Sequence, residues 1–253
     1  MKQKKWFLLI VAVVMLLACT GAAADVLTID LDTASYEEIV QGLDVLGRKQ
    51  KEMLAEQFAA EHEAEAPSAI CFRGVPWLAT KAEAEALLGH PSSSSKSRVA
   101  VPGKDNTVNS DGIGIEATYK SWSVAGYTPE KTTLCYVYPV VDGVMLRDDD
   151  LALFYLARYN IWDIGDPDAA VEDLKTKLTN LYGAYTTDRQ TLVWKDEAGN
   201  VIRMYFYANR IELTYYSAEA ENRYGQANQA IDDERAQQEL LNRIRNENNT
   251  DGL

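Results

Sequence analysis

The chain has 253 residues, of which 47% are hydrophobic and 25% are charged, and its formal net charge is −13 at pH 7. These proportions are typical of a folded protein rather than a disordered one, and the length allows one larger domain or two small ones. An acidic excess of this size repels phosphate backbones and anionic headgroups, which makes nucleic acid a poor candidate partner.

The first 24 residues have the order of a secretory signal peptide. Lys2, Lys4 and Lys5 form a basic start, an apolar run spans residues 6–18, and small residues occupy positions 21–24. The apolar run is shorter than the roughly 20 residues that a membrane-spanning helix needs. We therefore expect residues 1–24 to direct export. Losing their three lysines would change the net charge from −13 to −16.

Two cleavage sites are compatible with this signal. Leu16-Leu17-Ala18-Cys19 resembles the lipobox of bacterial lipoproteins, in which the peptidase cuts before the cysteine and the thiol carries a diacylglycerol. That resemblance implies lipidation of Cys19 and an extracytoplasmic protein anchored at the cell membrane. The alternative is cleavage after Ala24, which would give a secreted protein.

After a short leader, the pattern predicts a long helix that ends before Pro67. Ser35 and Glu38 have the spacing of a capping box, and apolar residues then recur at helical intervals. A short strand is predicted at 69–72. Thr80 and Glu83 form a second capping box that opens a helix closed by Gly89.

Two polar stretches, 91–97 and 102–112, are predicted loops, and the first is rich in serine. Apolar and polar residues then alternate with the period of strands, and Asp142-Gly143 is a typical hairpin turn. Asp166-Pro167 is an N-cap followed by proline at the first helical position, so it predicts a helix that Gly183 ends. The predicted strands are 113–122, 132–141, 151–162, 191–195, 201–207 and 211–217. A long polar helix is predicted at 218–246.

This order of elements predicts an α+β fold in which an antiparallel sheet has helices packed on one face and long helices at both ends. A short helix followed by about three strands occurs twice, which predicts two similar halves, 67–165 and 166–217. The predicted organisation is therefore a signal peptide, an N-terminal leader and helix at 25–66, an α+β domain at 67–217, and a C-terminal polar helix and tail at 218–253.

Three segments and the order of the predicted elements resemble known families. The helix start at Ser35–Val40, the run Phe72–Trp77 before a short helix, and the Leu-Tyr-Gly helix end at 181–183 are similar to units in uncharacterised secreted proteins and lipoproteins of Gram-positive gut bacteria. The helix-then-strands arrangement is also loosely similar to the β-lactamase-inhibitor-like and BamE-like lipoprotein folds. Known members of those folds bind other proteins, which implies a binding role here and supplies no catalytic residues.

Two cysteines, Cys71 and Cys135, remain after either cleavage, and both lie in short apolar runs. An oxidising compartment would permit a disulfide if the two Cα atoms lie within about 7 Å. Two buried, unpaired cysteines that act as small hydrophobic residues are the alternative.

No catalytic or metal-binding motif stands out. His62 and His90 have no histidine or cysteine partner at metal-ligand spacing, so we interpret both as solvated or capping residues. Asp148, Asp149 and Asp150 are consecutive, which favours a solvated turn over a calcium loop. A Gly-x-Ser-x-Gly nucleophile elbow is absent. We predict no catalytic residue, no metal and no cofactor.

Tyrosines in the predicted strands are the remaining candidates for function. Five of them would form a binding face if they shared an exposed side of the sheet: Tyr136, Tyr138, Tyr205, Tyr207 and Tyr215. The alternative is that they build the core. The sequence favours a non-catalytic, protein-binding module at the cell envelope whose partner is another envelope protein. A hydrolase of cell-wall or extracellular polymers and a structural spacer are the alternatives.

Overall fold

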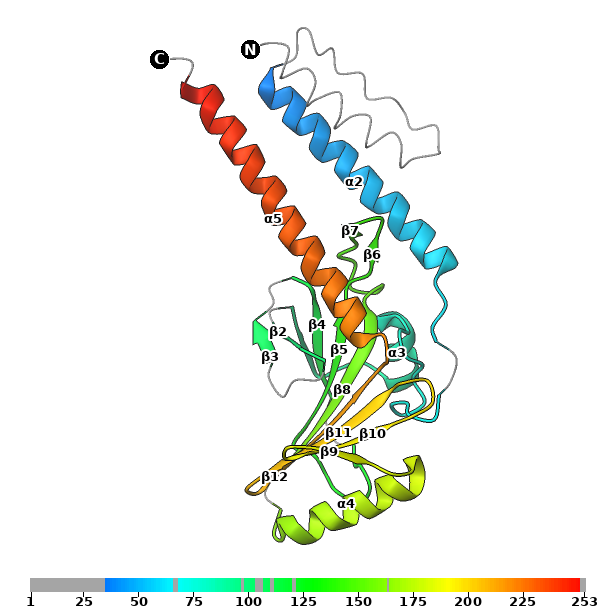
Figure 1. Ribbon diagram of the computed structural model, residues 1–253. Coiled ribbons are helices and arrows are strands. Elements are labelled where there is room, and N and C mark those ends of the chain that lie inside the picture. The colour runs from blue at the N-terminus through cyan, green and yellow to red at the C-terminus, as the bar shows by residue number, and fades with distance from the viewer. Residues whose placement is uncertain are drawn as a thin grey trace. The chain divides into compact units, whose positions relative to one another are not determined.

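A computed structural model describes residues 35–65, 68–96, 98–102, 107–109, 112–119, 122–162 and 164–250 (Figure 1). The predicted signal peptide and Cys19 lie outside these ranges. The chain divides into two compact units, one that ends at Gln57 and one that spans Phe58–Leu253. The second unit contains the sheet together with the C-terminal helix.

The first described helix, α2 (Tyr36–Glu61), begins where the capping box predicts. The Glu38 carboxylate accepts hydrogen bonds from the Ser35 backbone N–H (2.7 Å) and hydroxyl, and the Glu38 N–H donates to the Ser35 hydroxyl. These bonds satisfy amide groups that the first turn of a helix leaves unpaired.

An eight-stranded antiparallel sheet forms the centre of the second unit (Figure 1). Its spatial order is β1-β4-β5-β8-β12-β11-β10-β9. The bounds of these strands are β1 (Ser93–Ser95), β4 (Gly114–Tyr119), β5 (Lys131–Val137), β8 (Leu153–Ile161), β9 (Thr186–Asp188), β10 (Thr191–Lys195), β11 (Val201–Tyr207) and β12 (Arg210–Tyr216). Two small hairpins pair β2 (Arg98–Ala100) with β3 (Thr107–Asn109), and β6 (Val140–Val141) with β7 (Val144–Met145).

The sheet consists of two meanders that meet in the middle. In the first, α3 (Lys81–Leu88) precedes β1, β4, β5 and β8; in the second, α4 (Pro167–Tyr182) precedes β9, β10, β11 and β12. Each meander runs inward from an edge of the sheet, and the last strands, β8 and β12, pair with each other. The same topology, one helix followed by a four-stranded antiparallel meander, therefore occurs twice in the sheet.

The helix ends inside this unit follow the sequence signals. The Thr80 hydroxyl accepts the Glu83 N–H and the Asp166 carboxylate accepts the Ala169 N–H, while Gly89 and Gly183 close their helices with positive φ. Asp142 and Gly143 turn the β6–β7 hairpin with φ of 51° and 77°. The last helix, α5 (Ala220–Thr250), is continuous and contacts β5, β6 and β7.

Three local predictions were wrong, and one of them is the predicted loop at 102–112, which contains β3. Residues 69–72 are not a strand: Arg73 and Gly74 both have positive φ and turn the chain sharply, and Ile70 and Phe72 are apolar because they are buried. The serine-rich loop contains β1, whose exposed residues pair with β4 at the sheet edge. Backbone hydrogen bonds place β1 in the sheet, because its serine side chains bury nothing.

One face of the sheet, here called the apolar face, carries the main core. The register places Tyr159, Leu213 and Met204 in one row and Ala157, Tyr215 and Ile202 in the next. Phe72 packs against Tyr159 and Tyr215, and Trp77 stacks on Phe154. Helix α4 covers this face over β10 and β12, and the Trp194 indole N–H donates to Thr179 of α4. The predicted α+β class, an antiparallel sheet flanked by helices, is thus confirmed, with α4 on the apolar face.

Candidate functional site

The opposite side of the same sheet carries polar side chains over the half that is away from α5. Because directly paired residues of antiparallel strands share a face, the register defines its rows. One row is Asp188, Thr191, Tyr205, Glu212, Asn160 and Lys131. The next is Thr186, Val193, Arg203, Thr214, Arg158, Thr133, Thr118 and Ser93. Tyr207 and Arg210 begin a third row, at the sheet end. We call these rows the polar face.

A buried ion pair lies at the centre of the polar face. The Arg158 Nε atom is 3.1 Å from Glu212 Oε1, and the two residues are 8% and 2% exposed. Arg210 Nη2 donates to Glu212 Oε2 and to Asn160 Oδ1, the latter at 3.0 Å. Glu212 therefore lies between two guanidinium groups on neighbouring strands.

Both arginines have nitrogen atoms that lack an acceptor. Arg158 Nη2 and Nε and Arg210 Nε are buried and make no hydrogen bond of acceptable geometry in the structure. A buried donor without an acceptor costs about 1–3 kcal/mol, and more for a charged group. Some N–H donors in this part of the sheet therefore have no acceptor among the described side chains.

Exposed aromatic residues border this centre. Trp162 directly follows β8, and the Arg210 guanidinium lies 4.9 Å from the centre of its ring. Tyr207 pairs with Arg210 across β11 and β12. Tyr207 is 67% exposed and Trp162 is 43% exposed. Tyrosine, arginine and tryptophan thus stand side by side at the open end of the polar face.

The five tyrosines predicted as a binding face do not form one. Tyr136, Tyr138 and Tyr215 are buried, and burial raises the pKa of the Tyr136 and Tyr215 hydroxyls well above the usual value. Tyr136 and Tyr215 belong to the apolar face, whereas Tyr205 and Tyr207 belong to the polar face. The prediction placed residues from both sides of the sheet on one surface, because strand register is not visible in single strands.

The two cysteines are free thiols in the structure, so they are not joined by a disulfide. Cys135 is buried on β5, and burial raises its thiol pKa to about 12. Cys71 is half-buried in the turn segment before Phe72. This matches the alternative of two unpaired cysteines that act as small hydrophobic residues.

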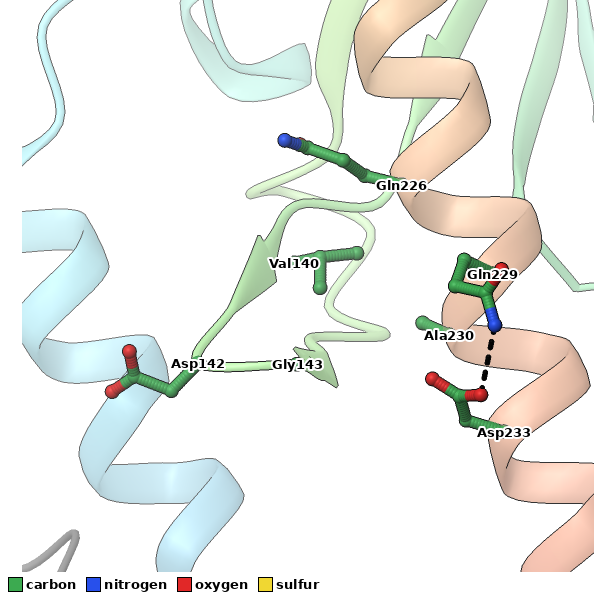
Figure 2. Close-up of a pocket in the computed structure, with 7 residues that line it drawn as sticks. All are labelled: Val140, Asp142, Gly143, Gln226, Gln229, Ala230 and Asp233. Carbon is green, nitrogen blue, oxygen red and sulfur yellow. Dashed lines mark hydrogen bonds between the residues drawn. The ribbon is translucent and has the colours of Figure 1, made fainter.

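A shallow groove of about 390 Å³ lies between the β6–β7 hairpin and α5 (Figure 2). Val140, Gly143 and Ala230 supply its apolar surface, and its polar groups come from Asp142, Gln226, Gln229 and Asp233. Gln229 donates to Asp233 at 2.9 Å, and Asp142 points away from α5 (Figure 2). The lining contains no histidine, and its ionisable groups are the carboxylates of Asp142 and Asp233.

The histidines and the aspartate triplet have structural contacts. His90 is exposed and pairs with Glu85, whereas His62 stacks on Phe58 and contacts the Leu78 carbonyl oxygen through Nε2. His62 is thus a packed residue and not a solvated one. Asp149 accepts a hydrogen bond from the Tyr138 hydroxyl and pairs with Lys96.

The described ranges contain no group of three or more histidine, cysteine, aspartate or glutamate side chains arranged to hold a metal ion. None of the helices in these ranges combines the length and apolar character that crossing a bilayer requires.

Comparison of the chain with protein-family models, with curated proteins and with solved structures gave no match. The resemblances noted from the sequence therefore stay predictions, and the site is interpreted from its own geometry.

Sequence reasoning missed the residues that define the polar face. Arg158, Trp162 and Glu212 belong to predicted strands, whereas Arg210 lies one residue before the predicted strand 211–217. In β12, Ile211, Leu213 and Tyr215 alternate with polar residues. The same alternation in β8 and β11 would have marked Arg158 and Arg203 as members of a polar side. The alternation does not show which strands are neighbours, so it could not predict which polar residues meet.

Proposed function

We propose that this protein is an extracytoplasmic, lipid-anchored binding module that recognises another envelope protein through the polar face. It is exported by residues 1–24 and held at the membrane by Cys19. The row Tyr207–Arg210–Trp162 is the observation that carries the proposal. These three residue types dominate the binding energy of protein interfaces, because each offers a large contact area together with a polar group.

The surroundings of this row support the same role. An interface hot spot is most effective where contacts around it exclude water, and here threonines and the ion pair of Arg158 with Glu212 lie behind the exposed row. Strands of a large sheet hold these side chains more rigidly than loops would. No group of titratable residues in the described ranges suggests a reaction, so binding is the function that we propose.

The test is capture of a partner from the native envelope by the full-length, affinity-tagged protein after chemical crosslinking. We expect Trp162→Ala and Tyr207→Ala to reduce recovery of one particular envelope protein at least tenfold, because hot-spot residues contribute about 2 kcal/mol or more each. Leu181→Ala is the matched control, since Leu181 is also an exposed apolar residue but lies on α4.

Equal recovery with all three variants would contradict the proposal that the polar face binds the partner. The anchor is tested separately, by mass spectrometry of the mature N-terminus. A diacylglycerol on Cys19 is the expected result, and an N-terminus at Asp25 would contradict it.

A further inference from the structure

The unused donors of Arg158 and Arg210 are the starting point. Arg158 makes one polar contact in the described part of the chain, its ion pair with Glu212, although a guanidinium has five N–H donors. Arg210 uses Nη2 alone for hydrogen bonds, and its Nε has no acceptor. Two neighbouring guanidinium groups thus each have nitrogen atoms without an acceptor at one place on the sheet.

The charges around them specify what could supply those acceptors. The polar face carries four cations, Lys131, Arg158, Arg203 and Arg210, and two carboxylates, Asp188 and Glu212. Glu116 from the adjoining row pairs with Lys131 at 2.9 Å. The polar face therefore has two more positive than negative charges, in a protein whose overall charge is −13, and the adjoining row, which adds Glu116 and Lys195, leaves this difference unchanged. Glu212 repels any anion that approaches these donors, and the repulsion is smaller for a carboxylate, which carries one negative charge, than for a phosphate, which carries up to two.

We propose that this is a carboxylate-binding site, in which an aspartate or glutamate side chain of the partner protein binds to the guanidinium groups of Arg158 and Arg210. The proposal rests on the proposed function and specifies its partner chemistry. A planar guanidinium and a carboxylate can form two parallel hydrogen bonds, an arrangement that adds geometric specificity to the charge attraction.

Access to the site runs through Arg210. Its side chain is 33% exposed, whereas Arg158 is almost fully covered. Arg210 is held by Asn160, Glu212 and the Trp162 ring, which are non-covalent contacts at the surface end of the strands. The proposal requires the Arg210 side chain to shift so that the same carboxylate also reaches Arg158. Trp162 and Tyr207 then contact the residues that flank the partner's acidic side chain.

The experiment uses acetate as the minimal carboxylate and the full-length protein. Melting temperature is measured in sodium acetate and in sodium chloride at equal ionic strength and pH 7.5. We expect acetate to raise the melting temperature in a saturable way and to shift the Arg158 and Arg210 Nε–H resonances. Arg210→Gln, at a partly exposed position, should abolish both effects without emptying the core.

Two further variants test whether the acetate affinity changes only where the proposal predicts a change. Glu212→Gln removes the carboxylate that competes for the same donors, so acetate should bind about tenfold more tightly, the factor that corresponds to about 1.4 kcal/mol. Arg147→Gln is the matched control, because Arg147 is also a half-exposed, ion-paired arginine but pairs with Glu234. Its acetate response should equal that of the unmodified protein.

Identical melting temperatures in acetate and chloride would overturn the proposal. So would an acetate response that survives in Arg210→Gln, or a response to inorganic phosphate without one to acetate. Binding to phosphatidylglycerol vesicles that depends on Arg210, with no acetate response, would assign the site to a membrane surface instead. If acetate has no effect but the Trp162 and Tyr207 variants still lose the partner, the proposed function stands and the carboxylate site fails.

Discussion

The two faces of the central sheet use the same strands but differ in what stabilises them. On the apolar face, rows such as Tyr159, Leu213 and Met204 pack under Phe72, Trp77 and α4. On the polar face, the residues between them in sequence, such as Arg158, Glu212 and Arg203, form ion pairs with little apolar burial. We therefore expect the apolar face to provide most of the folding stability and the polar face to provide little of it.

A buried ion pair is weak evidence for stability, because the cost of removing two charges from water offsets most of their attraction. We expect the protein to be about as stable with apolar residues at the positions of Arg158 and Glu212, because such replacements of buried ion pairs are often neutral or stabilising. Their presence in the middle of a sheet, with donors left over, is compatible with the proposed binding role. Each of the following predictions tests this distinction.

The largest expected effect is on the apolar face. Trp77 is fully buried, stacks on Phe154, and donates its indole N–H to the Ile70 carbonyl oxygen at 2.8 Å. Trp77→Ala should lower the free energy of unfolding by about 3–5 kcal/mol, the range for truncating a large buried aromatic residue. Urea unfolding followed by circular dichroism measures it, and a loss below 1 kcal/mol would mean that this face is not the main core.

Next in size is the removal of one charge from the buried pair. Glu212→Leu leaves the Arg158 guanidinium buried without its counter-ion, and we expect a loss of about 3 kcal/mol in the same urea assay. The double variant Arg158→Leu with Glu212→Leu should recover to within about 1 kcal/mol of the unmodified protein while losing partner capture. A double variant as unstable as the single one would show that the polar face is needed for folding.

The reactivities of the two cysteine thiols can be compared without a substitution on either face of the sheet. Cys135 is buried on the side of β5 opposite the apolar face, and its thiol pKa of about 12 leaves almost no thiolate at pH 8. We expect iodoacetamide to modify the half-buried Cys71 in the native protein and to modify Cys135 only after unfolding. Mass spectrometry of native and urea-treated samples measures this, and native labelling of Cys135 would mean that the sheet opens readily.

The smallest expected effect is on the exposed row of the polar face. Tyr207→Ala removes a side chain that is 67% exposed, so the free energy of unfolding should change by less than about 0.5 kcal/mol. The same urea titration measures it, and the variant also serves in the capture experiment. A larger loss would assign Tyr207 to packing and would weaken its role as a binding residue.

Much of the secondary structure was predictable because its signals are local. The capping pairs Ser35–Glu38 and Thr80–Glu83 and the Asp166-Pro167 start act within one helical turn, and all three are confirmed. The segment 69–72 was predicted wrongly because its apolar residues are buried by packing and not by strand pairing. In β1 the opposite happened, since backbone pairing with β4 overrides a composition typical of loops.

The sequence by itself determined where α2 begins, where α3 and α4 begin and end, the α+β class, and the alternation along strands such as β12. Only the tertiary structure decided which strands are neighbours, and with them that Arg158, Glu212 and Arg210 meet while the tyrosines divide between two faces. The physical reason is the distance along the sequence over which each signal acts. Caps and alternation depend on residues within a few positions of one another. The rows of the sheet depend on hydrogen bonds between strands that lie about 50 residues apart, as Asn160 and Arg210 do.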